Sequence, residues 1–240
     1  MLGMAEIELS FFWGSRAVPL RKCSTNVLSL LDHLEQCCPK LNSWNAVRPK
    51  THLLKRTQES LQTELLQGVN RRETNSSPIL ELGYSFSLIS ASKGCRWWNL
   101  RIHCADYSDA VSNECTIELG TYEPCDLTLL KTLDWWKLLD GVVNIWRPEH
   151  GCLKTANANA GMIVAPLSVG WLTYLSNERF PDLPQLPKET PVREVKGLGR
   201  LVGELPTAFP SHLDDEFQKL TTIHKSFAAM FGKSVKAKQK

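Results

Sequence analysis

The stretch Gly83-Tyr-Ser-Phe-Ser-Leu-Ile-Ser-Ala-Ser-Lys-Gly-Cys-Arg-Trp-Trp-Asn-Leu-Arg-Ile-His-Cys-Ala105 decides the fold. Apolar residues and serines alternate over residues 84–88, which is the period-two pattern of a half-buried strand. Residues 92–94, Ser-Lys-Gly, supply a turn. The return strand places Trp98, Leu100, Ile102 and Cys104 on one face and Asn99, Arg101 and His103 on the other.

A third alternating run, residues 115–119, follows this hairpin. The three runs together predict an antiparallel meander with one apolar face and one polar face. The polar face carries Arg101, His103 and Glu118. From the residues alone it is a binding surface, an active site or a merely solvated surface.

Working outward, the periodicities predict further elements on both sides of the meander. Strands are expected at 6–13, 169–176, 192–195 and 199–205, and helices at 24–38, 52–69, 126–147 and 211–231. Residues 39–51, with Trp44 pinned to the core, and residues 151–161 are expected to be loops. The order β-α-α-β-β-β-α-β-β-β-α predicts an α+β fold, a mostly antiparallel sheet flanked by helices. Residues 1–231 are expected to form a single domain, and the Lys-rich residues 232–240 a disordered tail.

The amino-acid composition is typical of a soluble globular protein. It has 240 residues, 42% hydrophobic and 22% charged, with a formal charge of +3. The N-terminus lacks a signal-peptide pattern, and the longest apolar run is shorter than the roughly 18 residues of a membrane span. We therefore expect a cytoplasmic protein without membrane contact. The eight cysteines form no Cys-x-x-Cys pair and are expected to be reduced and structural.

The motifs of common catalytic centres are missing. No Gly-x-Ser-x-Gly elbow, His-Glu-x-x-His motif or cysteine cluster occurs, so no metal or other cofactor is expected. Cys104 cannot pair with His103, because neighbouring strand residues point to opposite faces. Residues 197–203 contain three glycines, but they lead into a strand and predict a hairpin turn, not a phosphate-binding loop.

Charge is unevenly distributed along the chain. Residues 106–140 hold eight acidic residues against two lysines, whereas no acid follows Glu216 and six lysines do. The acidic segment is either a solvated face or a surface that presents negative charge to a basic partner. The lysines lack interleaved aromatic residues, so the tail is expected to aid solubility, and no direct nucleic-acid binding is expected.

Three blocks carry a resemblance to a known family. Ser10-Phe-Phe-Trp-Gly-Ser-Arg16, Gly83-Tyr-Ser-Phe-Ser-Leu88 and Gly170-Trp-Leu-Thr-Tyr-Leu-Ser176 together resemble the immunity protein 52 family of bacterial polymorphic-toxin systems. The resemblance covers most of residues 6–230. It implies an α+β immunity protein that binds and neutralises a secreted toxin in the cytoplasm and protects the producing cell and its kin. The toxin is often a nuclease of restriction-endonuclease-like fold, delivered in some systems by a type VI secretion apparatus.

The resemblance carries no catalytic residue onto this chain. At the motif positions we interpret five residues as fold-forming, namely Trp13, Gly14, Arg16, Gly170 and Trp171. Because nuclease clefts must hold phosphate backbones, an acidic surface is expected to meet the toxin. The predicted contacts are Asp106, Asp109, Glu114, Glu118 and Glu123, with Trp97 as an aromatic anchor.

Two other functions stay open. One is a small soluble enzyme that uses the polar sheet face around Arg101 and His103, which would require a closed pocket and a perturbed histidine. The other is an RNA-associated protein that uses the lysine tail, which would require strongly salt-dependent binding.

Overall fold

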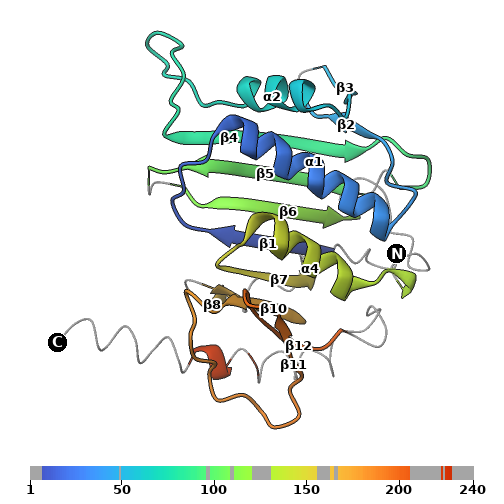
Figure 1. Ribbon diagram of the computed structural model, residues 1–240, viewed down its shortest axis with the longest axis vertical. Helices are drawn as coiled ribbons and strands as arrows, with labels where there is room; N and C mark the ends of the chain where they lie inside the picture. The colour runs from blue at the N-terminus through green and yellow to red at the C-terminus, as the bar shows by residue number, and fades with distance from the viewer. Residues whose placement is uncertain are drawn as a thin grey trace, which may run out of the picture. The chain divides into compact units, whose positions relative to one another are not determined.

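The protein is described here by a computed structural model covering residues 7–48, 50–95, 98–108, 111–120, 131–155, 163–164, 167–205, 223 and 225–228 (Figure 1). Its chain separates into two compact units, Phe11–Pro148 and Met1–Ser10 with Glu149–Lys240. The α+β class and the mostly antiparallel pairing predicted from the sequence are confirmed. The single domain over residues 1–231 stays a prediction.

The unit Phe11–Pro148 consists of a sheet and helices. Its elements are α1 (Leu20–Cys37), β2 (Trp44–Ala46), β3 (His52–Leu53), α2 (Gln58–Gln67), β4 (Leu82–Ser90), β5 (Trp98–Asp106), β6 (Asn113–Leu119), α4 (Trp135–Trp146) and the second half of β1 (Ile7–Trp13). The strand order is β1-β6-β5-β4-β2-β3.

The predicted meander is confirmed residue by residue. Strands β4 and β5 pair antiparallel with Phe86 opposite Ile102 and Ser85 opposite His103, and β6 continues the pairing on the other side of β5. Phe86 and Ile102 are buried on the apolar face. Ser85 and His103 therefore belong to the opposite, polar face, together with Arg101.

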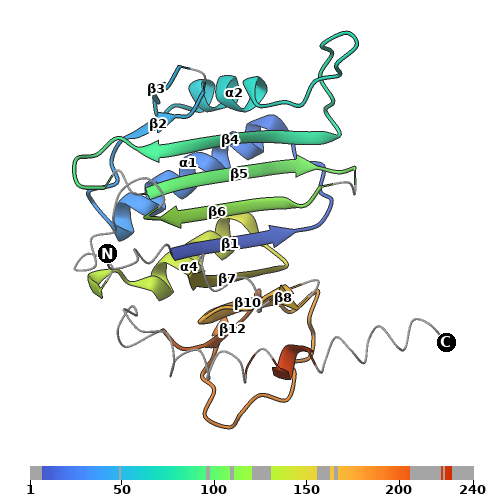
Figure 2. The same cartoon turned by 180° about the vertical axis from the view of Figure 1, so that it is seen from behind.

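Helices α1 and α4 cover the apolar face of this sheet, as Figures 1 and 2 show from its two sides. Six side chains of α1 are buried, and Val27, Leu30, Leu31 and Leu34 recur at helical spacing. The rings of Trp13 on β1 and Trp146 on α4 stack with centroids 5.3 Å apart, and both side chains are buried. Strand β1 therefore pairs with its neighbours in the sheet and also packs against α4 through an aromatic pair.

The second unit contains β7 (His150–Thr155), β8 (Ile163–Val164), β9 (Leu167–Ser168), β10 (Leu172–Ser176), β11 (Val192–Val195) and β12 (Gly199–Gly203). The sheet order within it is β11-β12-β10-β7, continued by the first half of β1, and β8 pairs separately with β9. Its apolar core is the cluster Val169, Leu175, Phe180, Val202, Ile223 and Phe227.

Several predicted boundaries were wrong. Helix α1 begins at Leu20, directly after Pro19, because proline suits a helix start but not its interior. Helix α2 begins only at Gln58, where the Thr57 side chain accepts a hydrogen bond from the backbone N–H of Ser60. Residues 44–46 form the strand β2 instead of a loop, although Trp44 is fully buried as expected.

Two longer predictions also need correction. The helix expected over residues 126–147 is interrupted, because Asp134 accepts a hydrogen bond from the backbone N–H of Lys137 and starts α4 anew. The loop expected over residues 151–161 is a strand as far as Thr155, since Cys152 and Leu153 are buried in the sheet. Of the last predicted helix, residues 223 and 225–228 are helical, and the tail lies outside the described residues.

Candidate functional site

An open polar groove lies on the face of the β4–β5–β6 meander opposite α1 and α4, the face turned to the reader in Figure 2. Its volume is about 460 Å³. The polar residues that line it are Arg48, Ser85, Ser87, Arg101, His103, Ser112 and Glu114. They come from the segment after β2, from β4 and β5, and from the start of β6. Backbone pairing in the sheet fixes the spacing of those that lie on strands.

Arg101 lines this groove, and its guanidinium group is held by an ion pair with a neighbouring strand. Its Nη2 forms an ion pair with Oε1 of Glu118 on β6. The other Glu118 oxygen, Oε2, accepts a hydrogen bond from Nδ2 of Asn99 at 2.7 Å, and Asn99 is buried. The Arg101 side chain is 49% exposed and that of Glu118 only 17%. Glu118 therefore holds the guanidinium in place more than it presents its own charge.

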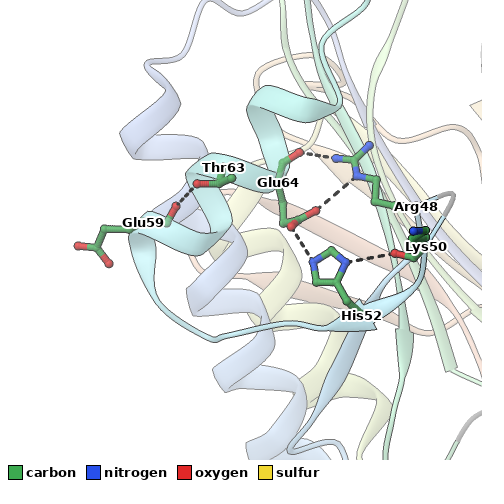
Figure 3. A network of polar contacts seen from close by, with 6 residues as sticks. All are labelled: Arg48, Lys50, His52, Glu59, Thr63 and Glu64. Carbon is green, nitrogen blue, oxygen red and sulfur yellow. Dashed lines mark hydrogen bonds and ion pairs between the residues drawn. The ribbon is translucent and has the colours of Figure 1, made fainter.

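Arg48 is anchored in the same way by Glu64 of α2 (Figure 3). Its Nε lies 3.4 Å from Oε2 of Glu64, and its Nη2 donates to the Glu64 backbone carbonyl. His52 Nε2 lies 2.9 Å from the second Glu64 oxygen, while His52 Nδ1 lies 3.3 Å from the carbonyl of Lys50. The Glu64 side chain is 5% exposed, so a buried carboxylate fixes the orientation of Arg48.

Ser85 and His103, which line the groove, form a polar row with the fully buried Asp106. Ser85 Oγ lies 2.5 Å from His103 Nδ1, as expected for residues directly opposite on β4 and β5. His103 Nε2 lies 3.5 Å from Asp106 Oδ2, and neither of these atoms has a hydrogen-bond partner among the described residues. Asp106 Oδ1 accepts hydrogen bonds from the backbone N–H and the hydroxyl of Ser108 at 2.9 and 3.0 Å.

The end of β5 that carries Asp106 is fixed by the buried side chain of Asn113. Its Oδ1 accepts from the Asp106 backbone N–H at 2.8 Å, and its Nδ2 donates to the carbonyls of Asp106 and Gly14. The backbone N–H of Arg16 donates to the same Asp106 carbonyl at 2.7 Å. The turn after β1 is thereby joined to the end of β5.

The row has the residue types of a catalytic triad but not its geometry. A triad requires the carboxylate to accept a hydrogen bond from the histidine, and 3.5 Å is beyond that distance. An oxyanion hole next to the serine also needs free backbone N–H groups, yet that of Ser85 donates to the carbonyl of Gly68. The row therefore links the strands, and the groove above it is open, not the closed pocket that the enzyme hypothesis requires.

The structure separates the residues predicted to contact a partner. Asp106 is fully buried, Glu118 is engaged with Arg101 and Asn99, and Glu114 lines the groove beside His103. Asp109, Glu123 and Trp97 lie outside the described residues. The polar face thus carries both charge signs, with Arg48, Arg101 and Glu114 lining its groove.

Arg48 and Glu64 were not predicted from the sequence. Arg48 stood in an apparent loop, and only the folding of β2 against β4 brings it to the groove. Glu64 did give a signal, because it lies between Leu61 and Leu65 on the inward face of α2. A charged residue on an apolar helix face requires a partner when it is buried.

The cysteines in the described ranges are all free thiols, and all but Cys37 are buried. Burial raises the pKa of Cys152 to about 12 and raises that of Cys115 as well. Among the described residues no three His, Cys, Asp or Glu side chains gather in a way that could hold a metal ion. The helices in the described part of the chain are too short or too polar to cross a membrane.

The chain is similar to known proteins over most of its length. The sequence matches the family "Immunity protein 52" over residues 9–220. The chain belongs to the immunity protein 52 family. Curated proteins gave no match. Among solved structures, "Pseudomonas aeruginosa T6SS protein PA0821" is similar with a TM-score of 0.49 and 16% identity, over 83% of this chain and 66% of that one.

Three of the residues that carry the resemblance to immunity protein 52, namely Trp13, Arg16 and Gly170, have structural roles in the fold. Trp13 stacks on Trp146, and the Arg16 guanidinium donates to the carbonyls of Trp146 and Arg147 at the end of α4. A Cβ on Gly170 would lie 2.1 Å from the Leu153 carbonyl oxygen, so only glycine fits there. These contacts belong to the scaffold, and none of these three residues lines the groove.

Proposed function

We propose that this immunity protein 52 family member binds a cognate secreted toxin in the cytoplasm and neutralises it by binding alone, without catalysis. Membership of the family supports the class of function. The observation that supports the place of binding is the polar face of β4–β5–β6, which no helix in the described residues covers. A polar face with fixed charges suits recognition of another protein, because complementary charges set register and exclude wrong partners.

We take the toxin to be a nuclease, because the charges of the groove suit a nuclease cleft. A nuclease cleft combines cations that hold phosphates with carboxylates that hold metal ions. The groove likewise offers both signs of charge, through Arg48 and Arg101 on one hand and Glu114 on the other. An immunity protein with this face can pair with both kinds of group and so obstruct the substrate path.

The acidic residues proposed to contact the toxin differ in their surroundings. Glu114 is the described acidic residue that lines the groove, whereas Asp106 is buried and Glu118 holds Arg101. Asp109, Glu123 and Trp97 remain proposed contacts from segments outside the described residues. In this proposal Asp106 stabilises the end of β5 and does not itself contact the toxin.

The test uses the cognate toxin domain, which is to be sought in the gene next to the one that encodes this chain. It is expressed in a bacterial host with and without the immunity protein, and growth and DNA integrity are followed. The wild-type chain is expected to restore growth and to form a complex in gel filtration. Glu114→Lys should weaken protection, while Glu73→Lys, an exposed residue of the same unit away from the groove, should not. A chain that neither binds nor protects would refute the proposal.

A further inference from the structure

We infer that Arg48 and Arg101 form a fixed pair of cations that receives carboxylate side chains of the toxin. This inference rests on the proposed function and reverses the sign of the main contact expected from the acidic segment. It names the chemistry of the partner group, an Asp or Glu side chain presented on a protein loop.

Both guanidinium groups are held in position before any partner arrives. Arg48 is bound through Nε and Nη2 to Glu64, and Arg101 through Nη2 to Glu118. An arginine has five N–H groups in a planar fork, so each of them keeps further donors for a second acceptor. Holding a long side chain in advance removes part of the entropy cost of binding.

The two anchoring carboxylates each have a further polar partner that does not line the groove. Glu64 also contacts His52, and Glu118 accepts from the buried Asn99. Neither Glu64 nor Glu118 lines the groove, whereas both arginines do. The charges that a partner meets there are Arg48, Arg101 and Glu114, with a net of +1. The hydroxyls of Ser87 and Ser112 add hydrogen-bond donors.

The shape of the groove favours a protein group over a small free anion. Its volume of about 460 Å³ is far larger than a single phosphate requires, and it is open. Val111 lines its rim and is 46% exposed, so it offers apolar contact to a neighbouring side chain. A loop that carries an acidic residue beside an apolar one would use all of these features. In a nuclease, metal-binding carboxylates are groups of this kind.

The decisive experiment measures affinity for a catalytically inactive form of the cognate toxin domain. Arg101→Gln is expected to weaken binding by at least about tenfold, because an interfacial carboxylate would lose its charged partner. Arg101→Lys, which keeps the charge but loses the fork, should fall in between. Arg72→Gln, an exposed arginine of the same unit away from the groove, is the matched control.

Arg48→Gln leaves Glu64 buried with less compensation and is prone to unfold, so Arg48→Lys is measured as well, with thermal unfolding as the check. A double-mutant cycle then combines Arg101→Gln with Asp→Asn and Glu→Gln changes across the toxin surface. At least one toxin carboxylate should show coupling of threefold or more with Arg101.

The outcomes separate the two proposals. Failure of the wild-type chain to bind or protect would refute the proposed function. Normal binding by folded Arg101→Gln and Arg48→Lys, or coupling to toxin lysines and arginines only, would overturn this inference and leave the proposed function standing. Arginine-dependent binding of inorganic phosphate, with toxin binding unaffected by the same variants, would overturn it too, because the groove would then serve a free anion.

Discussion

Gly68, the residue that caps α2, lies directly against Ser85 of β4. A Cβ built on Gly68 would stand 1.6 Å from the Ser85 carbonyl oxygen. The backbone N–H of Ser85 donates in turn to the Gly68 carbonyl at 3.2 Å. The helix that carries Glu64 is thereby fastened to the strand that carries the groove serines.

Replacing Gly68 by alanine is expected to destabilise the protein by about 1 to 3 kcal/mol, because backbone atoms cannot move aside. Gly141→Ala on α4 is the matched comparison. There the clashing atoms belong to the imidazole tip of His33, which is partly exposed and can swing away. The gain in helix propensity of up to about 1 kcal/mol offsets that loss. Urea unfolding of both variants checks this; equal destabilisation would contradict it.

Asp106 should behave as a structural residue. Asp106→Ala removes the acceptor of the two Ser108 hydrogen bonds and is expected to cost about 1 to 3 kcal/mol. Asp106→Lys places a cation at a fully buried position and should abolish soluble expression. Glu114→Lys, at the partly exposed groove wall, should fold normally. Soluble yield and thermal melting distinguish these cases, and a well-folded Asp106→Lys protein would show that the end of β5 opens.

Stability should fall on acidification through His150. Burial lowers the pKa of His150 to about 4, an effect that Arg179 reinforces and Glu149 opposes. The unfolded chain, with an ordinary histidine pKa of about 6.5, therefore binds more protons than the folded chain between pH 6.5 and 4. The contribution is fully present above pH 6.5 and lost as the pH falls through this window, by on the order of 3 kcal/mol.

The measurement is urea unfolding at a series of pH values for the wild type and His150→Gln. The variant should lose less stability than the wild type between pH 6.5 and 4. His33→Gln, at a partly exposed position on α1, serves as the control for replacing a histidine by glutamine. Parallel curves for His150→Gln and the wild type would count against the assignment.

The thiols should differ in reactivity by position. Iodoacetamide at pH 8, with the native protein, is expected to modify Cys37 well before Cys115 or Cys152, which are fully buried and whose pKa values are raised by burial. Peptide mass spectrometry over time gives the rate at each position, with urea-unfolded protein as the reference. Equal native rates at Cys37 and Cys152 would indicate that β7 opens readily.

The sequence predicted those elements whose burial follows one period. Alternation in β4, β5 and β6 predicted both faces of the meander, because apolar and polar side chains alternate between them, although Asn99, His103 and Thr116 of the polar face are also buried. The strand at residues 150–155 was not predicted. Small residues such as Gly151 and Cys152 show little periodicity in the sequence, yet they pair within a sheet. Short strands such as β2 depend on pairing with distant residues, which a local pattern does not contain.

The polar face was predicted from the sequence, whereas the arrangement of charges along its groove was not, and the toxin contacts themselves stay a prediction. The polar face with Arg101, His103 and Glu118 was expected, and it lines or supports the groove. A count of acidic residues cannot tell which of them point outward, and Asp106 is buried because of bonds to Ser108 and Asn113. Arg48 reaches the groove only through the tertiary pairing of β2 with β4.

In the chain of contacts Arg101–Glu118–Asn99, different side chains carry the charge and fix its position. Asn99 and most of Glu118, which fix the charge, are shielded from solvent, whereas the Arg101 side chain that carries it is 49% exposed. Substitutions at Ser87, Val111 or Ser112 can therefore reshape the groove wall without loosening the cations. In the proposed complex, a few substitutions on the groove wall would then change which toxin the chain binds, while the stability of its fold is preserved.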